Sequence, residues 1–270
     1  MYIGFLNRSF SFLFFKLSFF SSMNCTNSVI PPSNLNSNGF DFLCLKSLKN
    51  IKYSSGTLTI GNVEIFNLLI SKLDIPKRWK LRLSRHFWRE EYFNDLLKRL
   101  ETNSDVDPTI VEIDKKRYVK MLKEDLSNIV AGRTINEILK RFDQKIKDPR
   151  RASKGKNVSK IIKDFLKIKC PINKAAIELN KFFKKNKINL AVDQKYFPIS
   201  NNKVSKLNVV FSASFGRQLE YYTGMVFKID IKSKNSLKNI INGGRYDGLI
   251  SDLGSKKQTP AVGAALNLNY

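Results

Sequence analysis

Apolar residues recur every three or four positions over most of the chain from residue 61 to residue 187, which is the spacing of one helix face. The stripes expected to lie on helices are Val63 to Leu73, Trp79 to Phe87, Phe93 to Leu100, Tyr118 to Ile129, Ile135 to Phe142, Val158 to Phe165 and Leu179 to Phe183. Pro76 suits a first helical turn, and Thr134 with Glu137 has the spacing of a capping box. Asp148-Pro149 and Ser153 to Asn157 are expected breaks. No heptad repeat is sustained, so the stripes predict packed core rather than a coiled coil.

Short β-branched runs stand on either side of this helical stretch. Thr57–Ile60 alternates as a short strand does, and Ile188–Val192 and Leu207–Phe211 are predicted to be buried strands. The sequence therefore predicts an α+β fold, with a helical part at about residues 61–187 and a strand-rich part at about residues 188–270.

Residues 1–45 differ from the remainder of the chain. Phe10 to Phe20 is apolar and follows Arg8, as in a targeting signal, but Lys16 interrupts the run and no cleavage site of small residues follows it. The run is too short to span a bilayer, and the residues after it are polar and rich in Pro and Asn. We expect residues 1–45 to be an unstructured or spurious segment rather than a targeting signal, and residues 46–270 to form the core domain.

The formal charge of +25 makes nucleic acid a candidate partner. The lysines are spread from Lys46 to Lys257 rather than collected in one block, and Lys, Asn and Ile are abundant throughout. This is also the composition that an AT-rich genome gives to any protein, so the charge alone does not establish an RNA-binding surface.

Cysteine and histidine offer little chemistry. Cys25, Cys44 and Cys170 fit no zinc pattern and no disulfide framework, and Cys170, in a Lys-rich stretch expected to be helical, is predicted to be an inert thiol. His86 is the chain's single histidine, which argues against a metal site and against a Ser-His-Asp hydrolase. We expect no cofactor and no metal.

Three segments near the C-terminal end combine glycine, arginine and tyrosine. They are Phe215 to Phe227, Asn242 to Leu249 and Pro260 to Leu266. Arg217 and Arg245 each offer a planar fork that suits a carboxylate or a phosphate.

Tyrosines and glycines complete these segments. Tyr221, Tyr222 and Tyr246 offer ring walls with hydroxyls for a small planar ligand, and Gly243-Gly244 lets the backbone approach closely. A plain strand with alternating faces and a glycine hairpin would account for the same residues.

The resemblance to one family favours the pocket. Arg217-Gln-Leu-Glu-Tyr-Tyr-Thr-Gly resembles the R-G-L-D-Y-Y-T-G signature of histidyl-tRNA synthetases, Gly243-Gly-Arg-Tyr-Asp-Gly-Leu matches their second signature, and Pro260-Ala-Val-Gly resembles the start of the third class II motif. The fold implied is a partial class II synthetase-like antiparallel sheet with a helical insertion. The histidine-binding residues implied are Arg217, Glu220, Tyr221, Tyr222, Gly243, Gly244, Arg245 and Tyr246. In that family, Arg217 corresponds to the arginine that faces the substrate carboxylate and the α-phosphate.

The departures from the family pattern concern ATP. Asn267 and Tyr270 stand where the third motif should place a Gly and an ATP-binding Arg, and the first and second motifs have no counterpart in this sequence. Without those arginines no charge clamp holds the triphosphate, so adenylate formation is not expected. The chain from Gly61 through Trp79 to Phe87 is similar to ATP phosphoribosyltransferase regulatory subunits, and the resemblance covers roughly residues 56–270, without that family's N-terminal third.

That resemblance implies a cytoplasmic, non-catalytic regulatory subunit of histidine biosynthesis. It would bind free histidine and a short-form catalytic ATP phosphoribosyltransferase subunit, and it would bind neither tRNA nor a membrane. The alternatives are a truncated histidyl-tRNA synthetase, a basic RNA-binding remnant and a defective gene fragment that folds poorly.

Overall fold

The chain divides into two compact units, residues 1–69 with 165–270 and residues 70–164. The computed structural model describes residues 11–14, 55–102, 108–124, 129–130, 133–148, 151–197, 207–216, 221–233, 236–256 and 259–267.

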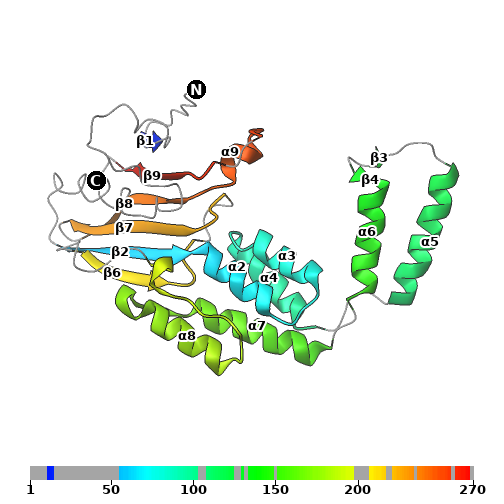
Figure 1. The fold of residues 1–270 in the computed structure, drawn as a ribbon, viewed down its shortest axis with the longest axis horizontal. Coiled ribbons are helices and arrows are strands. Elements are labelled where there is room, and N and C mark those ends of the chain that lie inside the picture. The colour runs from blue at the N-terminus through cyan, green and yellow to red at the C-terminus, as the bar shows by residue number, and fades with distance from the viewer. Residues whose placement is uncertain are drawn as a thin grey trace. The chain divides into compact units, whose positions relative to one another are not determined.

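The first unit contains, within the described ranges, a seven-stranded sheet in the order β1-β9-β8-β7-β2-β6-β5 (Figure 1). Its strands are β1 (Ser11–Phe14), β2 (Ser55–Asn62), β5 (Lys169–Pro171), β6 (Leu207–Ser212), β7 (Met225–Ser233), β8 (Ser236–Arg245) and β9 (Val262–Leu266). The predicted α+β class is confirmed, but the sheet is mixed, because β2 and β6 run parallel. A parallel pair needs a long crossover, and the helices between these two strands supply it.

One face of this sheet is apolar and buried. Ile60 of β2 lies opposite Phe227 of β7, and Leu58 lies opposite Ile229. These side chains are at most 3% exposed. Because residues directly opposite each other in an antiparallel pair share a face, they mark the side on which the core lies.

The other face carries polar groups. Thr59 lies opposite Lys228, whose Nζ is 2.9 Å from Oδ2 of the buried Asp230 carboxylate. Asn239 of β8 donates to Oδ1 of the same carboxylate at 2.9 Å. The buried charge is therefore paired and hydrogen-bonded, as a charge removed from water must be.

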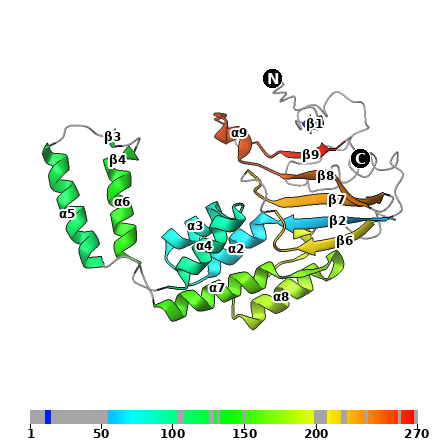
Figure 2. The same cartoon turned by 180° about the vertical axis from the view of Figure 1, so that it is seen from behind.

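The helices follow the predicted stripes closely. They are α2 (Val63–Lys72), α3 (Lys77–Arg85), α4 (Glu90–Leu100), α5 (Pro108–Glu124), α6 (Ile135–Ile146), α7 (Ala152–Leu166), α8 (Ala175–Lys185) and α9 (Leu249–Asp252), with 3-10 turns η3 (Ile172–Lys174) and η4 (Gln194–Tyr196). The capping box is confirmed, since Thr134 Oγ1 accepts from the Glu137 N–H and Glu137 Oε2 accepts from the Thr134 N–H. In the second unit, α5 and α6 run side by side as a helical hairpin (Figure 2).

Two expected helical features are wrong. Ile129 lies in the short strand β3 (Ile129–Val130), which pairs with β4 (Arg133–Thr134), rather than on the stripe that begins at Tyr118. Cys170 lies in β5 beside Phe211 rather than on a helix, and burial, followed by the charge of Glu178, raises the pKa of its thiol.

The expected strand Ile188–Val192 is also wrong, because none of these residues lies in a strand. The side-chain amide of Asn180 on α8 hydrogen-bonds both backbone groups of Val192. It accepts from the N–H at 2.8 Å and donates to the carbonyl at 2.8 Å. The amide makes the two hydrogen bonds that a neighbouring strand would otherwise offer to Val192.

The expected break at Ser153–Asn157 lies inside α7. A Cβ placed at Gly155 would collide with the carbonyl oxygen of Leu100 at the end of α4, so the two elements touch backbone to backbone. Glycine inside a helix costs about 1 kcal/mol, and close packing is the reason to accept it here.

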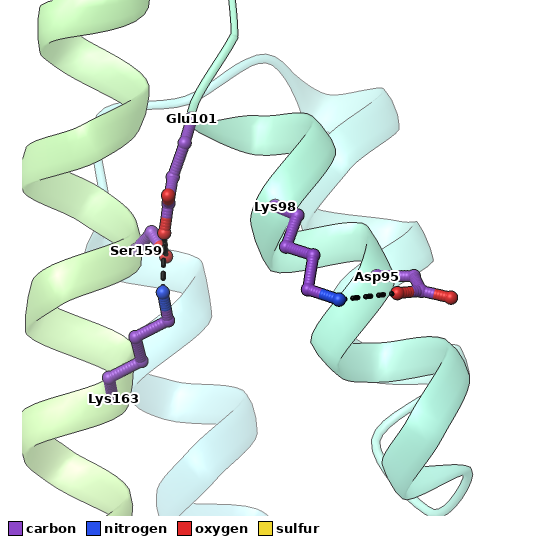
Figure 3. A network of polar contacts seen from close by, with 5 residues as sticks. All are labelled: Asp95, Lys98, Glu101, Ser159 and Lys163. Atoms are coloured by element: carbon purple, nitrogen blue, oxygen red, sulfur yellow. Dashed lines mark hydrogen bonds and ion pairs between the residues drawn. The ribbon is translucent and has the colours of Figure 1, made fainter.

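A polar network fixes the same approach of α4 to α7 (Figure 3). Oε1 of Glu101 accepts from the hydroxyl of the buried Ser159 at 2.7 Å and from Lys163 at 2.5 Å. The hydrogen bond from Lys163, followed by that from Ser159, lowers the pKa of the Glu101 carboxyl. The neighbouring Asp95–Lys98 pair, at 3.2 Å, is solvent-exposed and adds little.

The N-terminal segment is described only at Ser11–Phe14, where β1 pairs with β9. These four residues form an edge strand, unlike the unstructured stretch that was expected. Among the described residues, no helix combines the length and hydropathy needed to cross a bilayer.

Candidate functional site

A row of small residues crosses the polar face of the sheet. Gly61 of β2 pairs with Val226 of β7, Val226 with Gly244 of β8, and Gly244 with Gly263 of β9. Residues paired in this way share a face, so three glycines form a shallow floor across four strands.

Aromatic rings cover Gly244 and Gly263 of this floor. A Cβ at Gly244 would lie 2.7 Å from Cε1 of Tyr222, and a Cβ at Gly263 would collide with the hydroxyl of Tyr246. The floor must therefore be glycine for the two rings to lie where they do.

Tyr221, Tyr222 and Tyr246 form one cluster. The ring centroids are 4.7 Å apart for Tyr221–Tyr222, 5.6 Å for Tyr221–Tyr246 and 6.5 Å for Tyr222–Tyr246. The structure thus brings together the three tyrosines that the sequence singled out, although Tyr246 follows Tyr221 by 25 positions and Tyr222 by 24. Such a cluster presents ring faces and hydroxyls together, which suits a small planar polar ligand.

The hydroxyls of this cluster are held neutral. Burial, followed by the charge and hydrogen bond of Tyr221 and then by Tyr246, raises the pKa of Tyr222. Burial, followed by Tyr221, also raises the pKa of Tyr246. Both groups can therefore donate a hydrogen bond at any physiological pH.

We expect Tyr222 and Tyr246 to stay protonated in the folded protein at pH values where exposed tyrosines ionise. Because the folded-state pKa lies above the unfolded value of about 10, these phenols contribute stability below about pH 10 that is lost as the pH rises further. An alkaline titration followed by tyrosinate absorbance should show a late component that disappears in urea and shrinks in Tyr222→Phe. Simultaneous ionisation of all tyrosines in the folded chain would contradict this expectation.

Gly243 and Arg245 lie on the other side of β8. A Cβ at Gly243 would meet the Phe227 ring at 2.7 Å, on the core face, so its side-chain direction leads away from the tyrosines. Arg245 Nε donates to Oδ2 of Asp247 at 2.7 Å. The predicted arginine fork is thus already paired with a carboxylate of the chain itself.

Strand β7 begins at Met225, directly after a bend at Gly224. Arg217 and Glu220 lie outside the described residues, so their predicted place in the site stays a prediction. Gly61 and Gly263 were not singled out from the sequence. Gly263 stands inside the quoted Pro260-Ala-Val-Gly segment, whereas nothing local marks Gly61 as part of the site.

Comparisons with known proteins all point to relatives of histidyl-tRNA synthetase. A family model described as histidyl-tRNA synthetase matches residues 42–270. The ATP phosphoribosyltransferase regulatory subunit of Brucella anthropi is 26% identical over 228 residues, which are 78% of this chain and 60% of that protein. The corresponding protein of Agrobacterium fabrum is 28% identical over 229 residues with the same two coverages. The histidyl-tRNA synthetase structure from Nostoc sp. PCC 7120 aligns with a TM-score of 0.47 at 16% identity, covering 85% of this chain and 44% of that one.

The chain spans 60% of the length of these two curated relatives. The family model covers the helical stretch, strands β2 to β9 and all three motif segments. With the glycine floor and the tyrosine cluster in place on an α+β sheet of the class II synthetase type, the chain belongs to the histidyl-tRNA synthetase family.

Proposed function

We propose that this chain is the non-catalytic, histidine-sensing part of an ATP phosphoribosyltransferase. It would support the first step of histidine biosynthesis and the feedback control of that step by bound histidine. The proposal draws on the relatives named regulatory subunits and on the sequence departures at Asn267 and Tyr270.

The tyrosine cluster is the observation that carries the proposal. An imidazole is small, planar and polar, and the neutral hydroxyls of Tyr222 and Tyr246 offer it hydrogen-bond donors beside ring faces. Arg217 would pair with the histidine carboxylate, with Glu220 and Tyr221 beside it. Gly244 would leave room for the Tyr222 ring that lines the ligand site.

The partner implied is a short catalytic phosphoribosyltransferase subunit, and the compartment is the cytoplasm. A regulatory subunit acts by binding a catalytic one, so its effect is a coupling between the histidine site and the shared interface. Neither tRNA nor a membrane is needed for this role.

Capture of the full chain by an immobilised short catalytic subunit, with and without histidine, tests the proposal. We expect capture, and we expect histidine to change the amount captured. In calorimetry, Arg217→Ala should weaken histidine binding by about 10-fold or more, because a charge-assisted hydrogen bond contributes about 1.5–3 kcal/mol.

Arg85→Ala is the matched control, because it removes an exposed arginine of α3 in the other unit and should leave the affinity unchanged. Equal histidine affinities of the wild type and Arg217→Ala would contradict the proposed contact between Arg217 and the histidine carboxylate. If the wild-type chain binds no histidine, the proposed histidine-sensing role is wrong.

A truncated synthetase is the second candidate, because the family model itself is named for that enzyme. Histidine-dependent pyrophosphate exchange by the purified chain would establish it. The proposal above expects no exchange, since the positions of the ATP-binding residues are Asn267 and Tyr270.

A further inference from the structure

The Arg245 side chain lies on the side of β8 away from the tyrosine cluster. Successive residues of a strand point to opposite faces, and Arg245 stands between Gly244 and Tyr246, which both face the cluster. Its aliphatic part passes over Gly224, where a Cβ would lie 3.2 Å from the Arg245 Cδ. Its Nε then donates to Oδ2 of Asp247 at 2.7 Å. The guanidinium is therefore committed to a neighbour rather than directed into the site.

Asp247 connects three segments of chain. Its Oδ1 accepts from the Ala261 N–H at 3.3 Å, and its own N–H donates to Oγ1 of Thr223 at 3.0 Å. Backbone bonds join the same segments, from Thr223 N–H to the Arg245 carbonyl and from Tyr246 N–H to the Ala261 carbonyl, each at 2.9 Å. Asp247 thus links three segments: its backbone N–H contacts the segment that carries Tyr222, and its carboxylate joins Arg245, next to Tyr246, to the segment that leads to Gly263.

We infer that Asp247 is a positioning residue which, together with Arg245, holds Tyr222 and Tyr246 against the glycine floor, and that Arg245 does not contact the ligand. The pair is partly exposed, with 35% of the Arg245 side chain and 24% of the Asp247 side chain accessible, so its role lies in geometry more than in stability. The consequence for histidine rests on the proposed function, whereas the consequence for the tyrosines does not.

Asp247→Asn, Arg245→Gln and the double variant of the full chain test this inference. In each, the late-ionising tyrosine component should move to lower pH, because loosened rings admit water and lose part of their burial. The histidine dissociation constant should rise about 10-fold in each single variant. It should rise by a similar factor in the double variant, because two changes that break one contact do not add.

Lys228→Gln is the matched control, because it breaks an ion pair of 2.9 Å on the neighbouring strand β7. It should leave the tyrosine titration where it is in the wild type. Thr223→Val removes the acceptor of the Asp247 N–H without changing charge, and it should move the titration in the same direction even if Asp247→Asn fails to fold.

An unchanged tyrosine titration in both Asp247→Asn and Thr223→Val would overturn the inference. Loss of histidine binding in Arg245→Gln with wild-type affinity in Asp247→Asn would also overturn it, because Arg245 would then touch the ligand. If the wild type binds no histidine at all, the proposed function fails, while the titration still decides the positioning role.

Discussion

Asp148→Ala is expected to lower the free energy of unfolding of the second unit by about 3 kcal/mol or more, because it removes the acceptor Oδ2 of the buried Trp79 N–H and of the partly buried Arg78 guanidinium. The Asp148 carboxylate is 0% exposed, and its Oδ2 accepts from Trp79 Nε1 at 2.7 Å and from the guanidinium of Arg78. Trp79 is itself 1% exposed, so water does not replace the lost acceptor without opening the core. Urea unfolding followed by tryptophan fluorescence measures the change, because both tryptophans of the chain lie in this unit.

The control for this variant is Asp143→Ala on α6. Asp143 pairs with Lys115 at 2.6 Å, but its side chain is 46% exposed, so its loss should cost less than about 1 kcal/mol. Asp148→Asn should fall between the two, since an amide oxygen still accepts from Trp79 but carries no charge for Arg78. A cost for Asp148→Ala no larger than that of Asp143→Ala would show that water or a shifted side chain satisfies the two donors.

The role of Asp148 could not be predicted from the sequence. Asp followed by Pro is an ordinary helix-ending pair, and it was predicted only as a break. Its partners lie 69 and 70 positions earlier in the chain, and nothing local relates the three residues. Helical stripes such as that of Phe93 to Leu100 were predictable because the periodicity of a helix is written in consecutive residues.

Two of the wrong local predictions are explained by a tertiary contact that the local sequence does not reveal. A glycine occurs at position 155 inside a helix because the Leu100 carbonyl leaves no room for a Cβ. Val192 lies outside any strand because the Asn180 amide makes hydrogen bonds to its N–H and its carbonyl. Neither contact can be derived from the few residues around it.

The site was predictable only in part, because some of its residues stand in local motifs and others are brought together by the fold. Tyr221, Tyr222 and Tyr246 stand in short motifs whose residues could be read directly, and the structure brings them together. The glycine floor depends instead on register, which places Gly61 opposite Val226 across a separation of 165 positions. Register is fixed by hydrogen bonds between strands and by the burial of one face, so it follows only from the assembled sheet.

Gly263→Ala should therefore disrupt the sheet unit and the candidate site together, although it adds one methyl group. The new Cβ would collide with the Tyr246 hydroxyl and would also lie 3.1 Å from its Cζ. Tyr246 is only 7% exposed, so the ring has little room to withdraw. We expect a loss of about 1–3 kcal/mol in stability, the usual cost of overpacking a filled site. A shift of the late tyrosine titration to lower pH should accompany it.

Gly248→Ala provides the comparison, because a Cβ there meets nothing closer than 3.6 Å and the backbone φ is −84°. That variant should be as stable as the wild type, or more stable by about 0.4–1 kcal/mol through the lower entropy of its unfolded chain. Tyr246→Phe added to Gly263→Ala removes the oxygen that the new methyl strikes, so the double variant should recover part of the lost stability. Calorimetric unfolding of these three variants and the wild type distinguishes these outcomes. A Gly263→Ala chain as stable as the wild type, with no recovery from Tyr246→Phe, would mean that the tyrosine does not rest on the floor of the sheet.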